Sequence, residues 1–391
     1  MAIDQDAIDL FQPQINRNRQ ATQDNATQTA LVASHVESNE ARIKALEDET
    51  PPVDPPVDPP TGEWWDDLRS AAELIAAGIT GAGQGATVHT SKQTVTTLLE
   101  NFVVKNVNGR ALQLNGVNAI ARDFQIANSG SGVNDGSRIQ SRHPAVHPMN
   151  SGSKKATFEN FEVFGSPVNG LAGGNHPDTE VIIRRGHFRD NTTLGLRFTY
   201  PPAVAAAIKL FGVDKALLED LFIENQAGAG AWVDGSNAHD VVWRRGLYQG
   251  IAGPSIFPEL LKRALIVDPV IIGGEILIDA EDVVVTGAAM FATRGIRSRP
   301  TRRDGGRTIS SKVSGCYQEF TPNSFYGWNG VPTNTSHSFL SGGVATGSGV
   351  PNTFRLNRDW KIFRKANARL TYAQWVDQTG NDADAEIIEV T

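Results

Sequence analysis

The stretch Phe158-Glu-Asn-Phe-Glu-Val-Phe-Gly165 holds the pattern that decides the fold. Its apolar residues are spaced as in a short β-strand, and it ends at a glycine, a turn residue. Five other segments share its template, which is apolar, charged, polar, apolar or Gly, any, apolar, any, turn residue. They are Leu99-Glu-Asn-Phe-Val-Val-Lys-Asn106, Ala121-Arg-Asp-Phe-Gln-Ile-Ala-Asn128, Ile183-Arg-Arg-Gly-His-Phe-Arg-Asp190, Leu218-Glu-Asp-Leu-Phe-Ile-Glu-Asn225 and Trp243-Arg-Arg-Gly-Leu-Tyr-Gln-Gly250. The chain therefore carries an internal β repeat.

The spacing of the copies predicts a solenoid with loops. Copies begin at 99, 121, 158, 183, 218 and 243, and a looser copy, Val284 to Phe291, follows. The short intervals, 22 to 25 residues, suit one coil of a parallel β-solenoid with three short strands. The additional residues of the long intervals must leave the coil as excursion loops. We place these excursions at Ser129–Thr157, Asn191–Leu217 and Ile251–Val283.

The second position of the template predicts how the coils stack. In chain order it reads Glu100, Arg122, Glu159, Arg184, Glu219 and Arg244, a strict alternation of sign. Parallel strands lie about 4.8 Å apart, so coils stacked in register place opposite charges beside each other on one outer face. This ladder also explains the arginine pairs at 184–185 and 244–245 without a bound anion. We expect each pair of opposite charges on neighbouring coils to stabilise the stack modestly.

The first 50 residues carry a heptad pattern. Steps of seven from Ile8 give β-branched residues, and three residues after each comes a second series, Phe11, Asn18, Asn25, Val32, Asn39 and Leu46. This polar, narrow seam predicts an α-helical coiled coil that forms only by self-association, and we expect three chains. Asn18, Asn25 and Asn39 form its polar core layers. They either fix register and oligomer number or hold an ion on the axis.

The remaining organisation follows from prolines and from a short amphipathic segment. Residues 51–62 contain a tandem PPVD repeat, which predicts a semi-rigid polyproline II linker. Residues 63–80 include an apolar stripe with Trp64 and Trp65, which predicts a capping helix. We assign 81–320 to the solenoid body and 321–391 to its C-terminal end or cap.

The repeat resembles the right-handed parallel β-helix of the pectate-lyase-like superfamily. The order of coiled coil, proline linker, capping helix and β-helix is similar to that of a bacteriophage tail fibre or tailspike. The segment from Tyr372 to Asp382, with Trp375, Thr379 and Gly380, resembles the W-x-x-x-T-G-x-D ending of many such proteins. The resemblance implies a mainly β fold, a right-handed parallel β-helix preceded by a trimeric coiled coil. It implies no catalytic residue, because lyases, hydrolases and binding proteins share this scaffold.

Composition excludes several classes of protein. The chain has 36 Lys and Arg against 43 Asp and Glu, a net charge of −7, so we expect no nucleic-acid partner. Its single cysteine, Cys316, excludes an intramolecular disulfide framework. We find no stretch of about 18 apolar residues and no signal-peptide pattern, so we predict no membrane span.

The excursions hold our candidate carbohydrate-binding residues, because a solenoid forms binding surfaces from insertions on one face. Residues able to stack on or hydrogen-bond to a sugar ring are Arg138, Arg142, His147, Tyr200 and Phe257. The acidic residues near turns, among them Asp234 and Asp279, identify no catalytic pair by linear spacing, because such pairs can come from adjacent coils. We assign no catalytic residue, no metal site and no cofactor.

The sequence therefore predicts a homotrimeric virion protein, exposed as a fibre or spike. Its N-terminus would contact other virion proteins, and its body would bind a host-surface receptor, expected to be a polysaccharide glycan. Two alternatives stay open. The body either cleaves its ligand as a polysaccharide depolymerase, a glycoside hydrolase or lyase, or serves as a structural decoration protein without a ligand.

Overall fold

The computed structural model describes residues 85–134, 139–148, 153–174, 178–192, 205–235, 239–298, 310–321, 326–328, 345–346, 351–356, 358–365, 368–379 and 381–389. All of them belong to one unit of the chain, Ala77–Thr391. The predicted coiled coil with Asn18, Asn25 and Asn39, the proline linker and the predicted capping helix lie outside the described residues.

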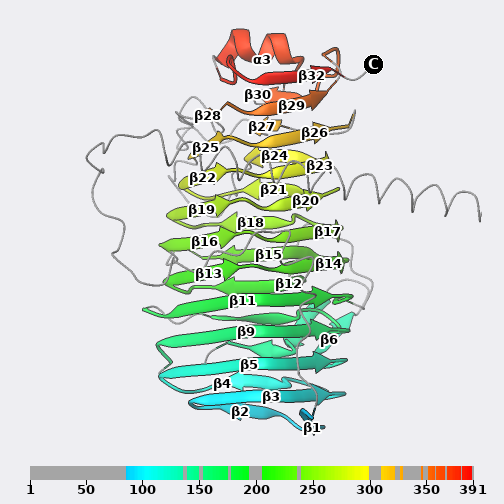
Figure 1. Cartoon of the computed structure of the whole chain (residues 1–391), viewed down its shortest axis with the longest axis vertical. Coiled ribbons are helices and arrows are strands. Elements are labelled where there is room, and N and C mark those ends of the chain that lie inside the picture. Colours follow the sequence, from blue (N-terminus) through cyan, green and yellow to red (C-terminus); the bar gives the residue numbers. More distant parts are fainter. Residues whose placement is uncertain are drawn as a thin grey trace, which may run out of the picture. The chain divides into compact units, whose positions relative to one another are not determined.

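Two large sheets form the described body (Figure 1). The larger sheet contains β1 (Thr87–His89), β3 (Leu98–Lys105), β5 (Asn118–Ala127), β9 (Lys155–Phe164), β11 (Glu180–Arg189), β13 (Lys215–Glu219), β14 (Phe222–Gln226), β16 (Asp240–Arg244), β17 (Leu247–Ile251), β19 (Arg263–Val267), β20 (Val270–Ile272), β22 (Asp282–Thr286), β23 (Ala289–Thr293), β25 (Ser310–Ser314), β26 (Tyr317–Phe320), β28 (Ala345–Thr346), β29 (Thr353–Leu356) and β32 (Glu386–Glu389). The smaller sheet contains β2 (Gln93–Val95), β4 (Leu112–Leu114), β8 (Val146–His147), β10 (Leu171–Gly174), β12 (Ala206–Phe211), β15 (Ala229–Asp234), β18 (Ile256–Glu259), β21 (Glu275–Ile278), β24 (Gly295–Ser298), β27 (Tyr326–Trp328), β30 (Phe363–Lys365) and β31 (Ala368–Leu370). A separate antiparallel hairpin joins β6 (Ser131–Asn134) to β7 (Ile139–His143), and the one helix of the described residues is α3 (Tyr372–Thr379).

The strands pair in parallel with strands one repeat away. In the larger sheet β3 pairs with β5, β5 with β9, and β9 with β11, while β10, β12 and β15 pair in turn in the smaller sheet. Each coil thus contributes to both sheets, and the coils stack one above another (Figure 1). This confirms the mainly β prediction and is compatible with a parallel β-solenoid.

The predicted register of the six repeats is confirmed. Glu100 faces Arg122, Arg122 faces Glu159, and Glu159 faces Arg184 on neighbouring strands. Arg184 then faces Glu219, which faces Arg244. The charge ladder inferred from sequence therefore exists as a stacked column.

The predicted bounds of the excursions and of the last copy were wrong in several places. β8, inside Ser129–Thr157, and β12, inside Asn191–Leu217, pair in parallel with strands of neighbouring coils. The segment Ile251–Val283 is no excursion, because β18, β19, β20 and β21 within it pair in register with strands before and after them. A further copy of the template, with Val267 in place of the charged residue, runs from Ile266 to Gly273, and Ile266 pairs with Trp243. The looser copy is also shifted by one residue, since Val285, and not Val284, faces Ile266.

Left-handed backbone explains the third and eighth template positions. Both positions adopt positive φ in nearly every coil, for example Asn101 at 51° and Asn106 at 59°. Asn, Asp and Gly tolerate this conformation best, which is why polar and turn residues recur there. The third position bends the long strand in its middle, and the eighth ends it.

At the eighth position, Gly165 makes room for a side chain of the coil before, whereas Gly273 does not. A Cβ on Gly165 would lie 2.3 Å from Asn128 Oδ1, whereas a Cβ on Gly273 would meet nothing within 4 Å. Both residues have similar φ, +68° and +73°. We predict that Gly165→Ala lowers the free energy of unfolding by about 2 kcal/mol and Gly273→Ala by about 1 kcal/mol.

Urea denaturation of the two glycine variants provides the measurement. The difference between them isolates the contact with Asn128, because the backbone cost is shared. Equal losses in the two variants would contradict this role of Gly165.

The C-terminal motif closes the described coils. Trp375 on α3 is fully buried, stacks on Phe363 of β30, and donates from Nε1 to Asp382 Oδ2 at 3.0 Å. Asn352 Nδ2 donates to the other carboxylate oxygen of Asp382 at 2.8 Å, and the hydroxyl of Tyr372 donates to the Asp382 carbonyl at 2.7 Å. The motif that resembles the ending of other β-helix proteins thus serves here to cover the last coils.

Candidate functional site

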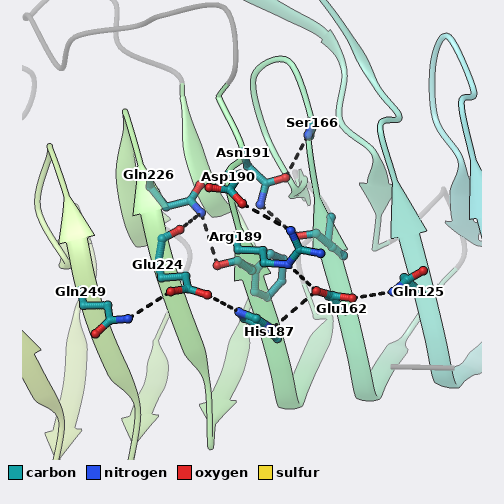
Figure 2. A network of polar contacts seen from close by, with 12 residues as sticks. Gln125, Glu162, Ser166, His187, Arg189, Asp190, Asn191, Glu224, Gln226 and Gln249 are labelled. Carbon is teal, nitrogen blue, oxygen red and sulfur yellow. Dashed lines mark hydrogen bonds and ion pairs between the residues drawn. The ribbon is translucent and has the colours of Figure 1, made fainter. Parts of the chain in front are cut away.

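A row of polar side chains crosses the outer face of the larger sheet. We call it the outer network and define it by six residues, Gln125, Glu162, His187, Arg189, Glu224 and Gln249 (Figure 2). They come from the fifth and seventh template positions on β5, β9, β11, β14 and β17. These positions alternate with the buried fourth and sixth positions, so the pleat directs their side chains outward. At about 4.8 Å per strand the network extends over about 19 Å.

His187 lies between two carboxylates. Its Nε2 is 2.9 Å from Glu224 Oε1, and its Nδ1 is 3.6 Å from Glu162 Oε1. The His187 ring also stacks on the ring of Phe222, with centroids 4.6 Å apart. One nitrogen donates in the neutral ring and both donate in the imidazolium, so the carboxylates hold the ring at either charge.

Amide and guanidinium groups complete the two carboxylate sites. Gln125 Nε2 donates to Glu162 Oε2 at 2.6 Å, and Arg189 Nε donates to Glu162 Oε1 at 2.5 Å. Gln249 Nε2 donates to Glu224 Oε2 at 3.0 Å. The guanidinium of Arg189 also lies 3.9 Å above the centroid of the Phe164 ring.

A buried set of amides supports this row from the adjacent turn. Asn191 Oδ1 accepts a hydrogen bond from the Ser166 amide, and Asn191 Nδ2 donates to the carbonyl of Val163 on β9 (Figure 2). Gln226 Nε2 donates to the carbonyl of Glu224 at 2.6 Å. These bonds fix the ends of β9, β11 and β14, and with them the strands that carry the network.

The outer network stays partly accessible to solvent. The exposed fractions of the side chains are 11% for Glu162, 14% for His187, 20% for Glu224 and 33% for Arg189. Planar amides, carboxylates and a guanidinium, with the rings of Phe164 and Phe222 beside them, are the groups that bind sugar hydroxyls and sugar faces. The arrangement suits binding of a polar, extended ligand.

A second cluster lies where three neighbouring strands of the smaller sheet, β15, β18 and β21, end. Asp234, Glu259 and Asp279 occupy one position on three successive coils, and we call them the acid column. Lys209 Nζ lies 3.3 Å from Asp234 Oδ2 and 3.0 Å above the Trp232 ring. The Trp232 indole in turn donates to Glu259 Oε2 at 3.0 Å.

The environment of Glu259 favours the protonated form of its carboxyl group. Burial, together with the charges of Asp234 and Asp279, raises the pKa of Glu259 to about 7. Glu259 is 3% exposed, Asp279 is 4% exposed, and the side chain of Asp234 is 18% exposed. A carboxylic acid of raised pKa beside a second carboxyl group is the combination that glycoside hydrolysis uses.

Of the residues that we predicted from sequence, the structure describes the side chains of His147 and Phe257, and neither belongs to the outer network or to the acid column. Arg138 and Tyr200 lie outside the described residues, and Arg142 lies on β7 with its side chain outside them. His147 is half-buried on β8. Phe257 on β18 is 1% exposed and stacks on Trp232 at 5.2 Å, so its ring offers no exposed face for a sugar.

Sequence reasoning missed Glu162, His187, Arg189 and Glu224, as well as Glu259. The first four were hidden in the two template positions that accept any residue, where Gln, Glu, His and Arg recur in adjacent coils. Polar residues that share an unconstrained outward position over several coils are the signal that identifies such a row. Glu259 was missed because its segment was predicted as a loop and not as a strand, so its pairing with Asp234 on the neighbouring coil was not expected.

Neither cluster has the arrangement of a metal centre. Among the residues that the structure describes, no group of three or more His, Cys, Asp or Glu side chains has the arrangement needed to hold a metal ion. The same described residues contain no helix long and apolar enough to cross a membrane.

Comparisons with protein-family models, with curated proteins and with solved structures found no match.

Proposed function

We propose that this chain is a subunit of a bacteriophage tail fibre or tailspike that binds a host-surface polysaccharide through the outer network. The outer network itself carries the proposal: partly exposed amide, carboxylate and guanidinium groups in line across five stacked coils, beside two aromatic rings. A ligand that repeats along its length can contact several coils at once, which compensates for shallow individual contacts.

The wider architecture in this proposal comes from the sequence. The heptads of residues 1–50 favour a trimeric coiled coil that joins the spike to other virion proteins, and the repeat favours a right-handed β-helix. Three copies of one weak site give avidity for a polymeric receptor on a cell surface. The protein is then part of the exposed virion.

Binding of the full-length protein to an array of purified bacterial capsular and O-antigen polysaccharides tests the proposal. We expect binding to at least one polysaccharide, and we expect Gln249→Ala to weaken it at least fivefold with an unchanged melting temperature. Gln249 donates to Glu224, and its loss leaves that carboxylate without one of its fixed donors.

The matched control is Arg263→Ala, which removes a side chain that is 63% exposed and paired with Asp240 outside the outer network. This variant should bind as the parent protein does. Equal binding by Gln249→Ala and the parent would place the site elsewhere, and a full-length protein that binds no array member would refute the proposal.

The acid column favours a second candidate function, cleavage of the bound polysaccharide. Paired positions on adjacent strands are about 4.8 Å apart, close to the carboxyl separation of a retaining glycosidase, and positions two coils apart are spaced as in an inverting one. Release of reducing ends from a bound polysaccharide, abolished by Glu259→Gln, would establish this activity. A rise in absorbance near 235 nm would indicate a lyase instead.

A further inference from the structure

The outer network carries more negative than positive charge. Glu162 and Glu224 contribute two carboxylates, and Asp190, with a side chain that is 53% exposed, adds a third at the edge of the network. Arg189 is the one permanent cation among these residues, and His187 is the one group that gains charge on protonation. The row therefore has more carboxyl groups than basic groups.

Both basic groups are already engaged by these carboxylates. The guanidinium of Arg189 donates to Glu162 at 2.5 Å and to Asp190 at 3.4 Å, and its plane rests over Phe164. His187 is placed between Glu162 and Glu224. A carboxylate or phosphate on a ligand would have to displace one of these pairs and leave a partly buried protein carboxylate without its partner.

An uncharged sugar faces no such penalty. Its hydroxyl groups donate to the remaining lone pairs of Glu162, Glu224 and Asp190, and accept from the second amide protons of Gln125 and Gln249. At a partly desolvated surface, the protein carboxylates repel a negatively charged ligand strongly. They therefore discriminate between charged and uncharged ligands of the same shape. The charge pattern thus selects among polysaccharides by the charge of their repeat unit.

We propose that the ligand class of the outer network is polysaccharides with uncharged repeat units, and not those with uronic acid or phosphate groups. This inference rests on the proposed function, that the outer network binds a polysaccharide. It adds the chemical class of the ligand.

The array of bacterial polysaccharides, sorted by repeat-unit charge and probed at about 0.15 M salt, tests the inference. We expect the bound members to have uncharged repeat units. The strongest of them, after oxidation of its primary hydroxyls to carboxylates, should bind the protein at least tenfold more weakly. Preferred binding of acidic members would overturn the inference and leave the proposed function intact, whereas a protein that binds no member would overturn both.

A charge variant separates electrostatic selection from shape. Glu224→Gln keeps the size of the side chain, exchanges one acceptor oxygen for an amide donor and removes one negative charge, so its affinity for the oxidised polymer should rise at least threefold. Glu389→Gln, which removes an exposed carboxylate paired with Arg358 outside the network, should leave both affinities unchanged. An unchanged discrimination in Glu224→Gln would show that charge does not select the ligand.

Discussion

Glu219→Gln is expected to lower the free energy of unfolding by about 3–5 kcal/mol. The Glu219 carboxylate is 4% exposed and contacts three guanidinium groups, those of Arg184 at 3.0 Å, Arg245 at 2.8 Å, and Arg244. Arg244 and Arg245 are themselves buried. Removing one charge leaves buried cations with too little compensation, which costs far more than the net contribution of an intact pair.

The ladder offers its own control. Glu100 occupies the same template position as Glu219 and pairs with Arg122 at 2.5 Å. Both side chains are nearly half exposed, 48% for Glu100 and 45% for Arg122. Glu100→Gln should therefore cost less than about 1 kcal/mol. Urea denaturation, with hydrogen exchange of β13 and β16 as a local readout, measures both variants. Similar losses in the two would contradict the view that burial sets the strength of this ladder.

Glu259→Gln is expected to raise the free energy of unfolding by about 3 kcal/mol at pH 8 and to leave it unchanged near pH 4. Burial and the flanking carboxylates raise the pKa of Glu259 to about 7 from 4.5, so the folded chain holds a proton that the unfolded chain has lost. The protein therefore loses stability as the pH rises from about 4.5 to 7. The amide of a glutamine keeps an acceptor for Trp232 and faces Asp234 and Asp279 without charge.

Denaturation of parent and variant at pH values from 4 to 8 measures this effect. In the variant, the free energy of unfolding should still decrease, less steeply, as the pH rises toward 6, because burial also raises the pKa of Asp268 to about 6. Glu389→Gln, which removes an exposed carboxylate, should shift stability by less than about 0.5 kcal/mol at every pH. If the free energies of unfolding of the parent and Glu259→Gln changed in parallel with pH, Glu259 would not be protonated in the folded protein near pH 7.

The repeat and its register could be predicted because burial constrains them. Core positions such as Phe124 and Phe161, whose rings stack at 4.7 Å, must be apolar in every coil, and the left-handed positions must be Asn, Asp or Gly in most. The copy from Ile266 to Gly273 escaped notice because its second position is Val267 and not a charged residue. A charge at that position is a feature of six coils only, so it is a poor criterion for the repeat.

The candidate site could not be predicted in the same way. Nothing in the core dictates the outward residues at His187 or Glu224, and their meeting depends on register across coils 37 residues apart in sequence. The burial of Glu219 and Arg244 was missed for a related reason, since their position on the strand gives the direction of a side chain and says nothing of what covers it. The exposure of a side chain depends on which other parts of the folded chain cover it.

Hydrogen exchange of the full-length protein, with and without a saturating polysaccharide from the array, tests the central claim most directly. The outer network lies on β5, β9, β11, β14 and β17, so binding there should slow amide exchange at the ends of these strands and in the turns that follow them. Exchange in β12, β15 and β18 of the smaller sheet should stay unchanged. Protection confined to the smaller sheet around Asp234 and Glu259, with none on the larger sheet, would contradict the claim.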